Sequence, residues 1–382
     1  MPERITHLTL KGFRSLRAIK RLELNAFNVL IGANGAGKSN LLEFFRMMNF
    51  AFGSTEGGIQ LYVGRTGRAS SLLYYGPQVT RHMDASIQFD GQGQWSRYDF
   101  SLSWGAPDEL FFASELLAYQ RDRDPRPSEV QLGSGHTESK VLSVADQAGN
   151  GWQRTTARVF RKRLREIRAY HFHDTSDDAN MRLSQDVHRE DTLMNNGGNL
   201  AAFLFGLKEK RPAHFKRILN TVQYIAPFIA DLVVEPESLN DRFVMLRWRD
   251  RSGAVFGPHQ LSDGTLRATA LITALLQPDE TMPGVMLFDE PELGLHPHGV
   301  CIVAELLKAA AEKRQVIVAT QSPLLIRDYD PSDIAVMERE EDREGRGATV
   351  IKRLDANDLA GWLEQYDLGQ LYEKNVTGGG PQ

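Results

Sequence analysis

The chain contains one cysteine, Cys301, and therefore cannot form an internal disulfide. It also lacks a continuous apolar run of about 18 residues, the length that a membrane-spanning helix requires. Its first residues, Met1–His7, contain no apolar signal region. The net charge of -4 gives no overall attraction to nucleic acid or to an anionic membrane. We therefore expect a cytoplasmic protein without a membrane partner, in which Cys301 is a core residue and any basic binding site is local.

Two further patterns are absent. No sustained heptads occur in residues 105–240, so we expect a compact lobe there and no long coiled coil. No cluster of cysteine and histidine completes a metal shell around His171, His173 and Asp174. These three residues remain candidate metal ligands, but we favour a structural or nucleotide-proximal role for the histidines.

A glycine-rich turn lies between an apolar segment, residues 29–31, and a helical pattern that continues to about Phe52. The turn fits the phosphate-loop spacing of Gly, four residues and Gly-Lys-Ser. Glycines have no Cβ, so backbone N–H groups can approach a polyphosphate, and the following helix directs its positive end at the same anion. Lys38 should reach the β- and γ-phosphates, and the Ser39 hydroxyl should bind Mg²⁺. The predicted phosphate-binding residues are Gly32, Asn34, Gly35, Ala36, Gly37, Lys38, Ser39 and Asn40.

Two acids follow a second apolar segment, residues 285–288. A fully buried parallel strand is apolar throughout, and ligands gather at the carboxyl ends of such strands. We predict that Asp289 holds Mg²⁺, through water or together with Ser39. Glu290 should be the general base that polarises the attacking water. The alternative is that both acids lie on the surface and cap the next turn.

A third apolar segment, residues 316–320, is followed by Gln321. Polar residues at the end of this strand would face the γ-phosphate. A glutamine there can hydrogen-bond that phosphate or orient a water. We therefore assign Gln321 as a catalytic residue that senses the γ-phosphate.

The segment Gln260–Arg267 lies between the phosphate loop and the two acids. Its serine, Ser262, is a good N-cap for a helix that runs through Leu275. The end of that helix could bind a second phosphate, but the chain has only one phosphate loop. The economical arrangement is a homodimer, or a higher homo-oligomer, in which each chain caps the nucleotide of its partner. The residues predicted to act in this way are Ser262, Asp263 and Gly264.

Residues 156–167 form an amphipathic pattern in which Phe160, Leu164 and Ile167 share one face. The rest of this segment is strongly basic. Such a helix could neutralise the phosphates of a nucleic acid. The alternative, which is more common for a run of charge, is a solvated face or a set of ion pairs. The basic residues are Arg158, Arg161, Lys162, Arg163, Arg165 and Arg168.

Together these motifs resemble the ATP-binding-cassette-type ATPases of the SMC/RecF/OLD-like group, above all the stand-alone bacterial predicted AAA-family ATPases. The resemblance spans nearly the whole chain and implies ATP and Mg²⁺ as cofactors, ATP hydrolysis, and an α/β ABC-type head with a mixed sheet. An antiparallel β lobe would occupy residues 70–115, and an α/β insert would hold the signature helix. The segments that carry the likeness are Gly32–Asn40, Ala169–Ser176, His259–Arg267, Phe288–Pro297, Ala319–Pro323 and Glu373–Gly378.

Two departures from the family pattern bear on function. Relatives in the broader group often have histidine where Gln321 stands, and glutamine cannot carry a proton, so turnover should be slow. No room for a nuclease domain remains after Leu354.

We therefore hold two hypotheses. The first is an ATPase coupled to DNA transactions such as repair or anti-phage defence. The second is an ATP-gated platform that restrains or activates a separate effector such as a nuclease. The signature sequence and the asparagine of the phosphate loop disfavour a third reading, a transporter subunit.

The family likeness leaves some contacts open. For the glutamine that usually lies between the phosphate loop and the signature, Gln78 is the guess, with Gln60 and Gln88 as alternatives. Arg14 is a candidate for contact with adenine. His296 either contacts the dimer seam or is a loop residue.

We divide the chain into an N-terminal half of the head, an insert, and a C-terminal half with the signature helix, at residues 1–115, 116–255 and 256–382. Local patterns predict antiparallel strands from Ser71 to about Trp104, a surface loop or hairpin region at residues 120–150, one final helix over Leu359–Tyr372, and a poorly ordered tail from Val376.

Overall fold

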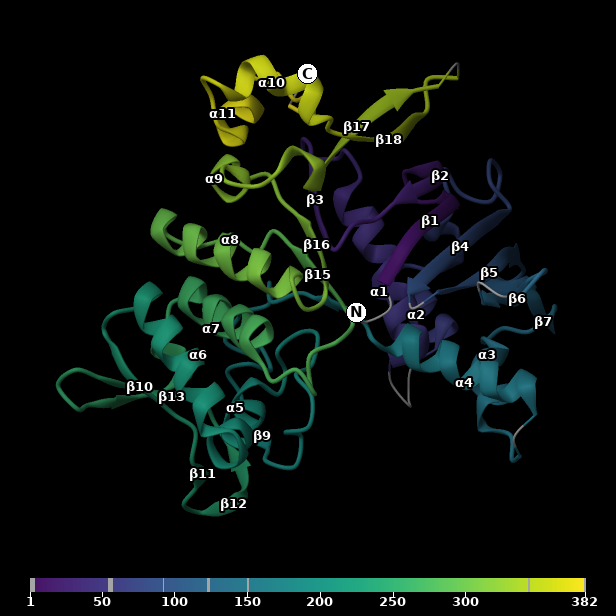
Figure 1. Cartoon of the computed structure of the whole chain (residues 1–382). Helices are drawn as coiled ribbons and strands as arrows, with labels where there is room; N and C mark the ends of the chain where they lie inside the picture. Colours follow the sequence, from purple (N-terminus) through teal and green to yellow (C-terminus); the bar gives the residue numbers. More distant parts are fainter. Residues whose placement is uncertain are drawn as a thin grey trace.

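The computed structural model describes residues 4–53, 58–91, 93–121, 124–149, 151–342 and 344–380. Two six-stranded sheets organise these residues, one mixed and one antiparallel. In Figure 1 the mixed sheet runs through the middle of the molecule. The antiparallel sheet and α1 (Lys38–Gly53) lie on one side of it, and α7 (Asp263–Leu276) and α8 (Pro297–Ala311) lie on the other. The predicted α/β class is confirmed.

The mixed sheet has the strand order β18-β17-β3-β16-β15-β8. The five strands from β17 to β8 are parallel, and β18 pairs with β17 in the antiparallel sense. This last pair forms a hairpin near the C-terminus. The strands are β3 (Phe27–Ile31), β8 (Ile167–Tyr170), β15 (Val285–Asp289), β16 (Gln315–Ala319), β17 (Ile334–Glu341) and β18 (Gly347–Arg353).

Alternate residues of these strands enter two separate cores. In β15, Met286 and Phe288 pack with α7 and α8, whereas Val285 and Leu287 pack with α1 and the antiparallel sheet. Side chains alternate along a strand, so a strand that is buried on both faces is apolar throughout. This explains the uninterrupted apolar segments before Asp289 and Gln321.

The antiparallel sheet has the order β2-β1-β4-β5-β6-β7, and it is larger than predicted. Its first two strands in the chain come from residues 4–23. The segment after Ser71 is not a strand until β4. The expected boundary between residues 115 and 116 falls inside β6, and the sheet continues to Gly133. The strands are β1 (Arg4–Phe13), β2 (Leu16–Glu23), β4 (His82–Gly91), β5 (Gln94–Gly105), β6 (Glu109–Arg121) and β7 (Ser128–Gly133).

The helix predicted at residues 156–167 is α4 (Trp152–Arg165), and its apolar face packs against α1 through Phe160 and Leu164. Within residues 120–150, where a surface loop or hairpin region was expected, β7 forms a hairpin with β6, and residues 140–146 form a helix. The other elements on this side of the mixed sheet are α2 (Ile59–Arg65), η1 (Ala69–Leu72) and α3 (Lys140–Asp146).

A compact lobe follows β8, as the lack of heptads predicts. It contains two small sheets, and the chain passes from one to the other between β12 and β13. The longest helix in the described part of the chain, α1, has 16 residues. The elements of this lobe are β9 (Gln185–Asp186), α5 (Leu200–Lys210), α6 (Pro212–Ile225), β10 (Ile229–Val233), β11 (Pro236–Glu237), β12 (Asn240–Val244), β13 (Arg247–Asp250), β14 (Val255–Phe256) and η2 (Pro258–Gln260).

The expected single helix over residues 359–372 is two helices, α10 (Ala356–Leu363) and α11 (Leu368–Glu373). Asp367 interrupts it, because its carboxylate accepts a hydrogen bond from the Gln370 N–H and caps α11. The remaining elements of this region are α9 (Pro323–Ile326) and η3 (Pro331–Asp333). Among the described residues, no helix is both long and apolar enough to span a membrane.

The expectation of a poorly ordered tail is wrong for residues 376–380. The Gly379 N–H donates to Glu338 Oε1 over 2.9 Å, and the Gly380 N–H donates to Asn375 Oδ1 over 2.9 Å. This segment therefore packs beside β17 and the phosphate loop. Residues 381 and 382 lie outside the described part of the chain.

Candidate nucleotide site

The phosphate loop connects β3 to α1, as the sequence predicts, and two of its glycines are required by close contacts. A Cβ on Gly32, where φ is +151°, would lie 2.2 Å from the carbonyl oxygen of Met337. A Cβ on Gly37, where φ is +107°, would lie 2.1 Å from Thr349 Oγ1. Only glycine fits at these two positions.

The Lys38 side chain is buried and folds back onto its own loop. Its Nζ donates to the carbonyl oxygen of Gly32 over 2.5 Å and to that of Ala33 over 3.1 Å. Burial lowers the pKa of Lys38, and the carboxylates of Glu290, Asp289 and Glu292 offset part of this shift. The amine thus faces the acids predicted to act in the same site.

Two hydroxyl residues that sequence reasoning missed hold the loop in place. Thr349 Oγ1 donates to the carbonyl oxygen of Ala36 over 2.8 Å and also lies 2.8 Å from Ser15 Oγ. Ser15 Oγ accepts from Asn40 Nδ2 over 2.7 Å. The turn between β1 and β2, the phosphate loop and β18 are therefore linked by one network. No short motif links Ser15 with Thr349, because 334 residues separate them in the chain.

The ends of three parallel strands bring the predicted catalytic residues together. In the register of the sheet, Asp289 lies beside Ala319, and Ala319 lies beside Leu30 at the start of the phosphate loop. The residues that follow these strand ends therefore converge at one edge. Gln321 Nε2 donates to Asn34 Oδ1 over 2.7 Å and to Glu290 Oε1 over 2.7 Å. The alternative, in which Asp289 and Glu290 only cap a surface turn, does not account for the hydrogen bond between Gln321 and Glu290.

Asp289 has the features expected of a cation ligand. Its side chain is mostly buried, and burial raises its pKa. The neighbouring Ser39 hydroxyl and the Arg46 guanidinium partly offset this rise in the pKa, and Arg46 Nη2 lies 3.8 Å from Asp289 Oδ2. Oδ1 is buried and has no hydrogen-bond partner among the described residues. A buried carboxylate oxygen without a partner, next to a serine hydroxyl, suits Mg²⁺.

Sequence reasoning also missed a second buried acid in this site. Glu292 Oε1 accepts a hydrogen bond from Thr320 Oγ1 over 2.5 Å, and burial raises the Glu292 pKa. Its Oε2 is buried without a partner among the described atoms. The repeated acids in the segment Asp289-Glu-Pro-Glu292 could have indicated this residue from the sequence.

The predicted signature residues lie at the start of α7, away from the phosphate loop of their own chain. Ser262 caps α7, because its Oγ accepts a hydrogen bond from the Thr265 N–H over 3.2 Å. A Cβ on Gly264 would lie 2.2 Å from the carbonyl oxygen of Gly294. No hydrogen bond or ion pair within the described ranges joins Ser262, Asp263 or Gly264 to residues 32–40.

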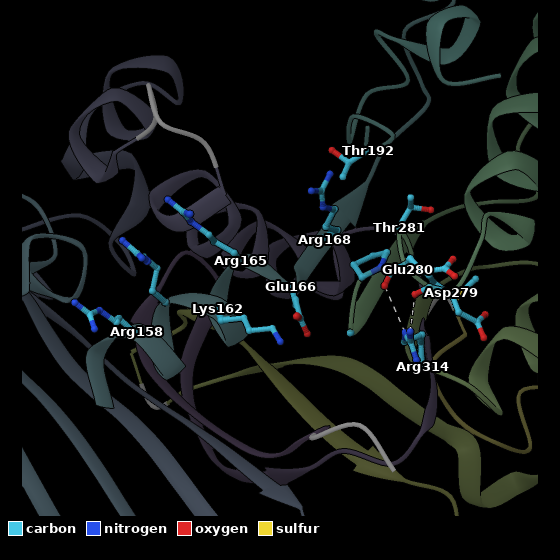
Figure 2. A pocket seen from close by; sticks show the side chains of 14 residues that line it. Arg158, Lys162, Arg165, Glu166, Arg168, Thr192, Asp279, Glu280, Thr281 and Arg314 are labelled. Carbon is cyan, nitrogen blue, oxygen red and sulfur yellow. Dashed lines mark hydrogen bonds between the residues drawn. The ribbon is translucent and has the colours of Figure 1, made fainter. Parts of the chain in front are cut away.

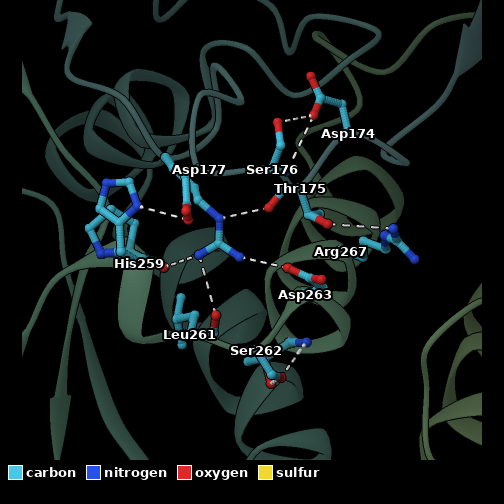
Figure 3. Close-up of polar contacts among 12 residues, drawn as sticks. Asp174, Thr175, Ser176, Asp177, His259, Leu261, Ser262, Asp263 and Arg267 are labelled. Carbon is cyan, nitrogen blue, oxygen red and sulfur yellow. Dashed lines mark hydrogen bonds and ion pairs between the residues drawn. The ribbon is translucent and has the colours of Figure 1, made fainter.

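A buried arginine that sequence reasoning missed holds the signature turn (Figure 3). Arg182 donates to Asp263 Oδ1 over 2.7 Å, to the carbonyl oxygen of Thr175 over 2.9 Å and to that of Leu261 over 3.3 Å. It also donates to the carbonyl oxygen of Pro258. Its guanidinium therefore connects the first residue of η2 and the residue after η2 with Thr175 and Asp263. Nothing in the local sequence around Arg182 identifies this role.

The histidines after β8 lie near the predicted acids without forming a metal cluster. His173 lines a small cavity together with Arg267, Asp289 and Glu290. Arg267 Nη2 donates to the His173 carbonyl oxygen over 2.9 Å, so this loop contacts the signature helix. Asp174 instead accepts from Ser176, and no three His, Cys, Asp or Glu side chains in the described part of the chain could hold a metal ion. Burial lowers the pKa of His171, and its ring lies 5.7 Å from that of His173.

The remaining candidates are less central. Gln60 and Gln88 hydrogen-bond to Leu110 and Asp90, within or beside the antiparallel sheet, so neither reaches the site. Gln78 is exposed on a loop, and its role remains a prediction. Three other residues have clear positions. Arg14 lies 3.8 Å from Glu43 of α1, His296 caps α8, and Cys301 is half-buried on α8 instead of being a core residue.

Comparison with solved structures defines the class of this fold. The Smc head bound to the C-winged helix domain of ScpA superposes with a TM-score of 0.54 and 18% identity, and the match covers 93% of this chain and 99% of that one. An Smc head with an extended coiled coil, bound to the C-terminal domain of ScpA and derived from Pyrococcus furiosus, gives 0.53 and 17%, with 95% and 99% covered. The predicted ABC-type head of the SMC-like group is therefore confirmed as the fold.

Residues 27–327 match the family described as "AAA domain, putative AbiEii toxin, Type IV TA system". The match covers most of the chain, and the protein belongs to this family of AAA-type ATPase domains. No curated protein matches the sequence.

Proposed function

We propose that two copies of this chain, in the cytoplasm, bind ATP and Mg²⁺ head to tail and hydrolyse the ATP between them. The observation that carries the proposal is the amide of Gln321, which donates both to Asn34 in the phosphate loop and to Glu290 after β15. One side chain thus connects the loop suited to phosphates with a carboxylate suited to act as a general base.

Each residue has a role in this scheme. The Lys38 amine leaves the carbonyl oxygens of its own loop and pairs with the β- and γ-phosphates. Ser39 and Asp289 hold Mg²⁺, which when bound neutralises charge on the phosphate oxygens. Glu290 accepts the proton of the attacking water, and Gln321 contacts the γ-phosphate and orients that water.

The head-to-tail arrangement is supported by the position of the signature residues. Ser262, Asp263 and Gly264 lie at a helix N-terminus, where the helix dipole and free N–H groups favour an anion. Because they make no hydrogen bond or ion pair with the phosphate loop of their own chain within the described residues, the nucleotide they cap belongs to a partner copy.

The test is the mass in solution of Glu290→Gln, with and without ATP and Mg²⁺. Removing the base should stall hydrolysis and leave binding intact, so ATP should convert monomer to dimer. Glu305→Gln, an exposed change on α8, is the matched control and should hydrolyse ATP as the wild type does. Wild-type turnover in Glu290→Gln, or no binding of ATP by either protein, would contradict the proposal.

We further propose that hydrolysis is coupled to DNA, and the basic face of α4 supports this. ATPase rates measured with and without duplex DNA test it, and a rate that ignores DNA, in a protein that binds none, would contradict it.

The second candidate is an ATP-gated platform for a separate effector protein such as a nuclease. Two observations favour it. Gln321 cannot carry a proton, which suits slow turnover, and the similar Smc heads are bound to a domain of another protein, ScpA. Brisk turnover together with no partner in pull-downs would count against it.

A further inference from the structure

A cavity of about 520 Å³ lies at the edge of the mixed sheet opposite to the nucleotide site. It is lined by α4 and β8 on one side and by the loop at residues 279–284 on the other (Figure 2). Glu166, Gly284 and Arg314 in its lining directly precede β8, β15 and β16. Because these strands are parallel, their first residues lie at one edge and Asp289 at the other. Five residues of strand separate the two edges by about 15 Å.

The lining is predominantly basic, although the chain as a whole is acidic. Six cationic side chains and three acidic ones line the cavity, whereas the net charge of the chain is -4. In Figure 2 the cations of α4 follow one another along the helix, and Arg314 faces them from across the cavity. The cations are Arg158, Arg161, Lys162, Arg165, Arg168 and Arg314, and the acids are Glu166, Asp279 and Glu280.

Most of these arginines are held by carbonyl oxygens and not by carboxylates. Arg165 Nε donates to the carbonyl oxygen of Phe52 over 2.8 Å, and Arg168 Nη1 donates to that of Leu193 over 2.9 Å. Arg158 binds the carbonyl oxygens of Ala145 and Gln147, each over 3.0 Å, and Arg314 binds that of Asp279 over 2.8 Å. A carbonyl oxygen fixes the position of a guanidinium but carries no net charge. The positive charge of the cavity therefore remains available to an anion.

The three acids of the lining cancel only part of that charge, because the cations outnumber them two to one. The carboxylate of Asp279 pairs with Lys313 over 3.0 Å. Arg161 pairs with Asp146, but the Asp146 side chain is 71% exposed, and such surface pairs are weak. The side-chain amine of Lys162 is exposed and has no hydrogen-bond or ion-pair partner within the described ranges. A charged side chain that forms no ion pair within the chain is free to bind an anionic ligand.

We propose that this cavity binds the phosphate groups of a polyanion, at a site separate from the phosphate loop. Arg158, Lys162 and Arg165 are spaced by four and three residues, which places neighbouring side chains about 5–6 Å apart on one face of α4. Such a row suits consecutive phosphates more than a single anion. The lining contains no aromatic side chain on which a base could stack, so the site reads phosphates and not bases.

Phosphates in a row have two sources, the backbone of a nucleic acid or a free oligophosphate. The site does not depend on ATP hydrolysis. If its ligand is a nucleic acid, this cavity supplies the contact for the DNA coupling proposed above, and in that respect it rests on the proposed function.

The experiment measures binding of two probes, a fluorescent oligothymidylate and inorganic tripolyphosphate, to the full chain. Every protein carries Lys38→Met, which removes the cation of the phosphate loop, so anions bound there are not mistaken for this site. The test variant adds Lys162→Gln, which breaks no hydrogen bond within the described residues. The matched control adds Lys216→Gln, an exposed lysine on α6 that does not line the cavity. Thermal melting checks that all the proteins are folded.

We expect Lys162→Gln to weaken binding several-fold and Lys216→Gln to leave it unchanged. For the oligothymidylate, the slope of log K against log salt should fall by about 0.7, the value for one phosphate contact on a single strand. Binding of the oligothymidylate with weak competition by tripolyphosphate identifies a nucleic-acid backbone, whereas binding of tripolyphosphate alone identifies a free oligophosphate. If neither probe binds, or if both lysine variants behave alike, the proposal is overturned.

Discussion

The side-chain amide of Gln321 donates a hydrogen bond to Glu290 Oε1 over 2.7 Å, although 31 residues separate the two in the chain. The same amide nitrogen donates to Asn34 Oδ1 over 2.7 Å. The two strands that carry Gln321 and Glu290 are neighbours in register, which places the residues after them side by side. A change in any one of the three residues should therefore affect the other two.

Gln321→Ala removes the donor that faces Glu290 and the phosphate loop. We expect kcat to fall about a hundredfold, as when one donor to a developing charge is lost. KM should change little, because Lys38 and the loop backbone still hold the phosphates. Steady-state ATPase kinetics measure both parameters. Gln365→Ala, at an exposed position just after α10, is the control. A hundredfold rise in KM for Gln321→Ala, with kcat unchanged, would contradict the proposed role of Gln321.

Arg182→Met should destabilise the protein by about 3 kcal/mol, because it removes the arginine donor from the carbonyl oxygens of Thr175 and Leu261. Urea unfolding measures this loss. Arg182→Lys should not restore stability, since an ammonium cannot reproduce the fork of a guanidinium. As a control, Arg242→Met breaks only the exposed pair with Asp186 and should cost less than about 1 kcal/mol. Similar losses in both proteins would show that Arg182 has no special role.

Glu292→Gln should change how stability depends on pH. Burial raises the pKa of Glu292 in the folded protein above its unfolded value. The stability that this group contributes is therefore fully present below the unfolded pKa, and it is lost as pH rises through the folded pKa. The glutamine variant keeps an acceptor for Thr320 and has no proton to lose. Relative to the wild type, it should gain stability as pH rises above about 4.3. Thermal melting across pH measures the difference, and a constant difference would refute this reasoning.

Gly379→Ala should weaken ATP binding. Its new Cβ would lie 2.8 Å from Val336 Cγ1 and 3.2 Å from the Cα of Gly32, the first glycine of the phosphate loop. Gly135→Ala is a matched control, because φ is +78° there and +77° at Gly379, but nothing lies within 4 Å of the added atom. Both variants bear the same backbone strain, so a larger Kd for a fluorescent ATP analogue in Gly379→Ala reports the contact with the loop. Equal affinities would mean that residues 376–380 do not position the loop.

The phosphate loop, the two acids and Gln321 could be predicted from the sequence, because each is a local pattern with a local physical cause. A glycine-rich turn after an apolar strand can approach a phosphate, and apolar strands buried on both faces carry polar residues at their ends. The order of those strands in the sheet could not be read from the chain. Only the resemblance to the ATPase family implied that the phosphate loop, the two acids and Gln321 lie in one site.

Other failures had local signals that were overlooked. Asp367 and Gln370 form a capping box that marks the start of α11, and it divides the helix expected over residues 359–372. The boundary placed between residues 115 and 116 ignored the alternating pattern that continues through β6. In both cases the local sequence contained enough information to place the element correctly.

By itself, the sequence determined the phosphate loop, the apolar strands and the acids that end one of them, because sterics and hydrogen bonding within a few residues set these features. The tertiary structure alone decided that Ser15 and Thr349 hold the loop, that Arg182 supports the signature turn, and that the cations of α4 face Arg314 across a cavity. These contacts join residues from distant parts of the chain. They depend on how sheets and helices pack, which no local pattern encodes.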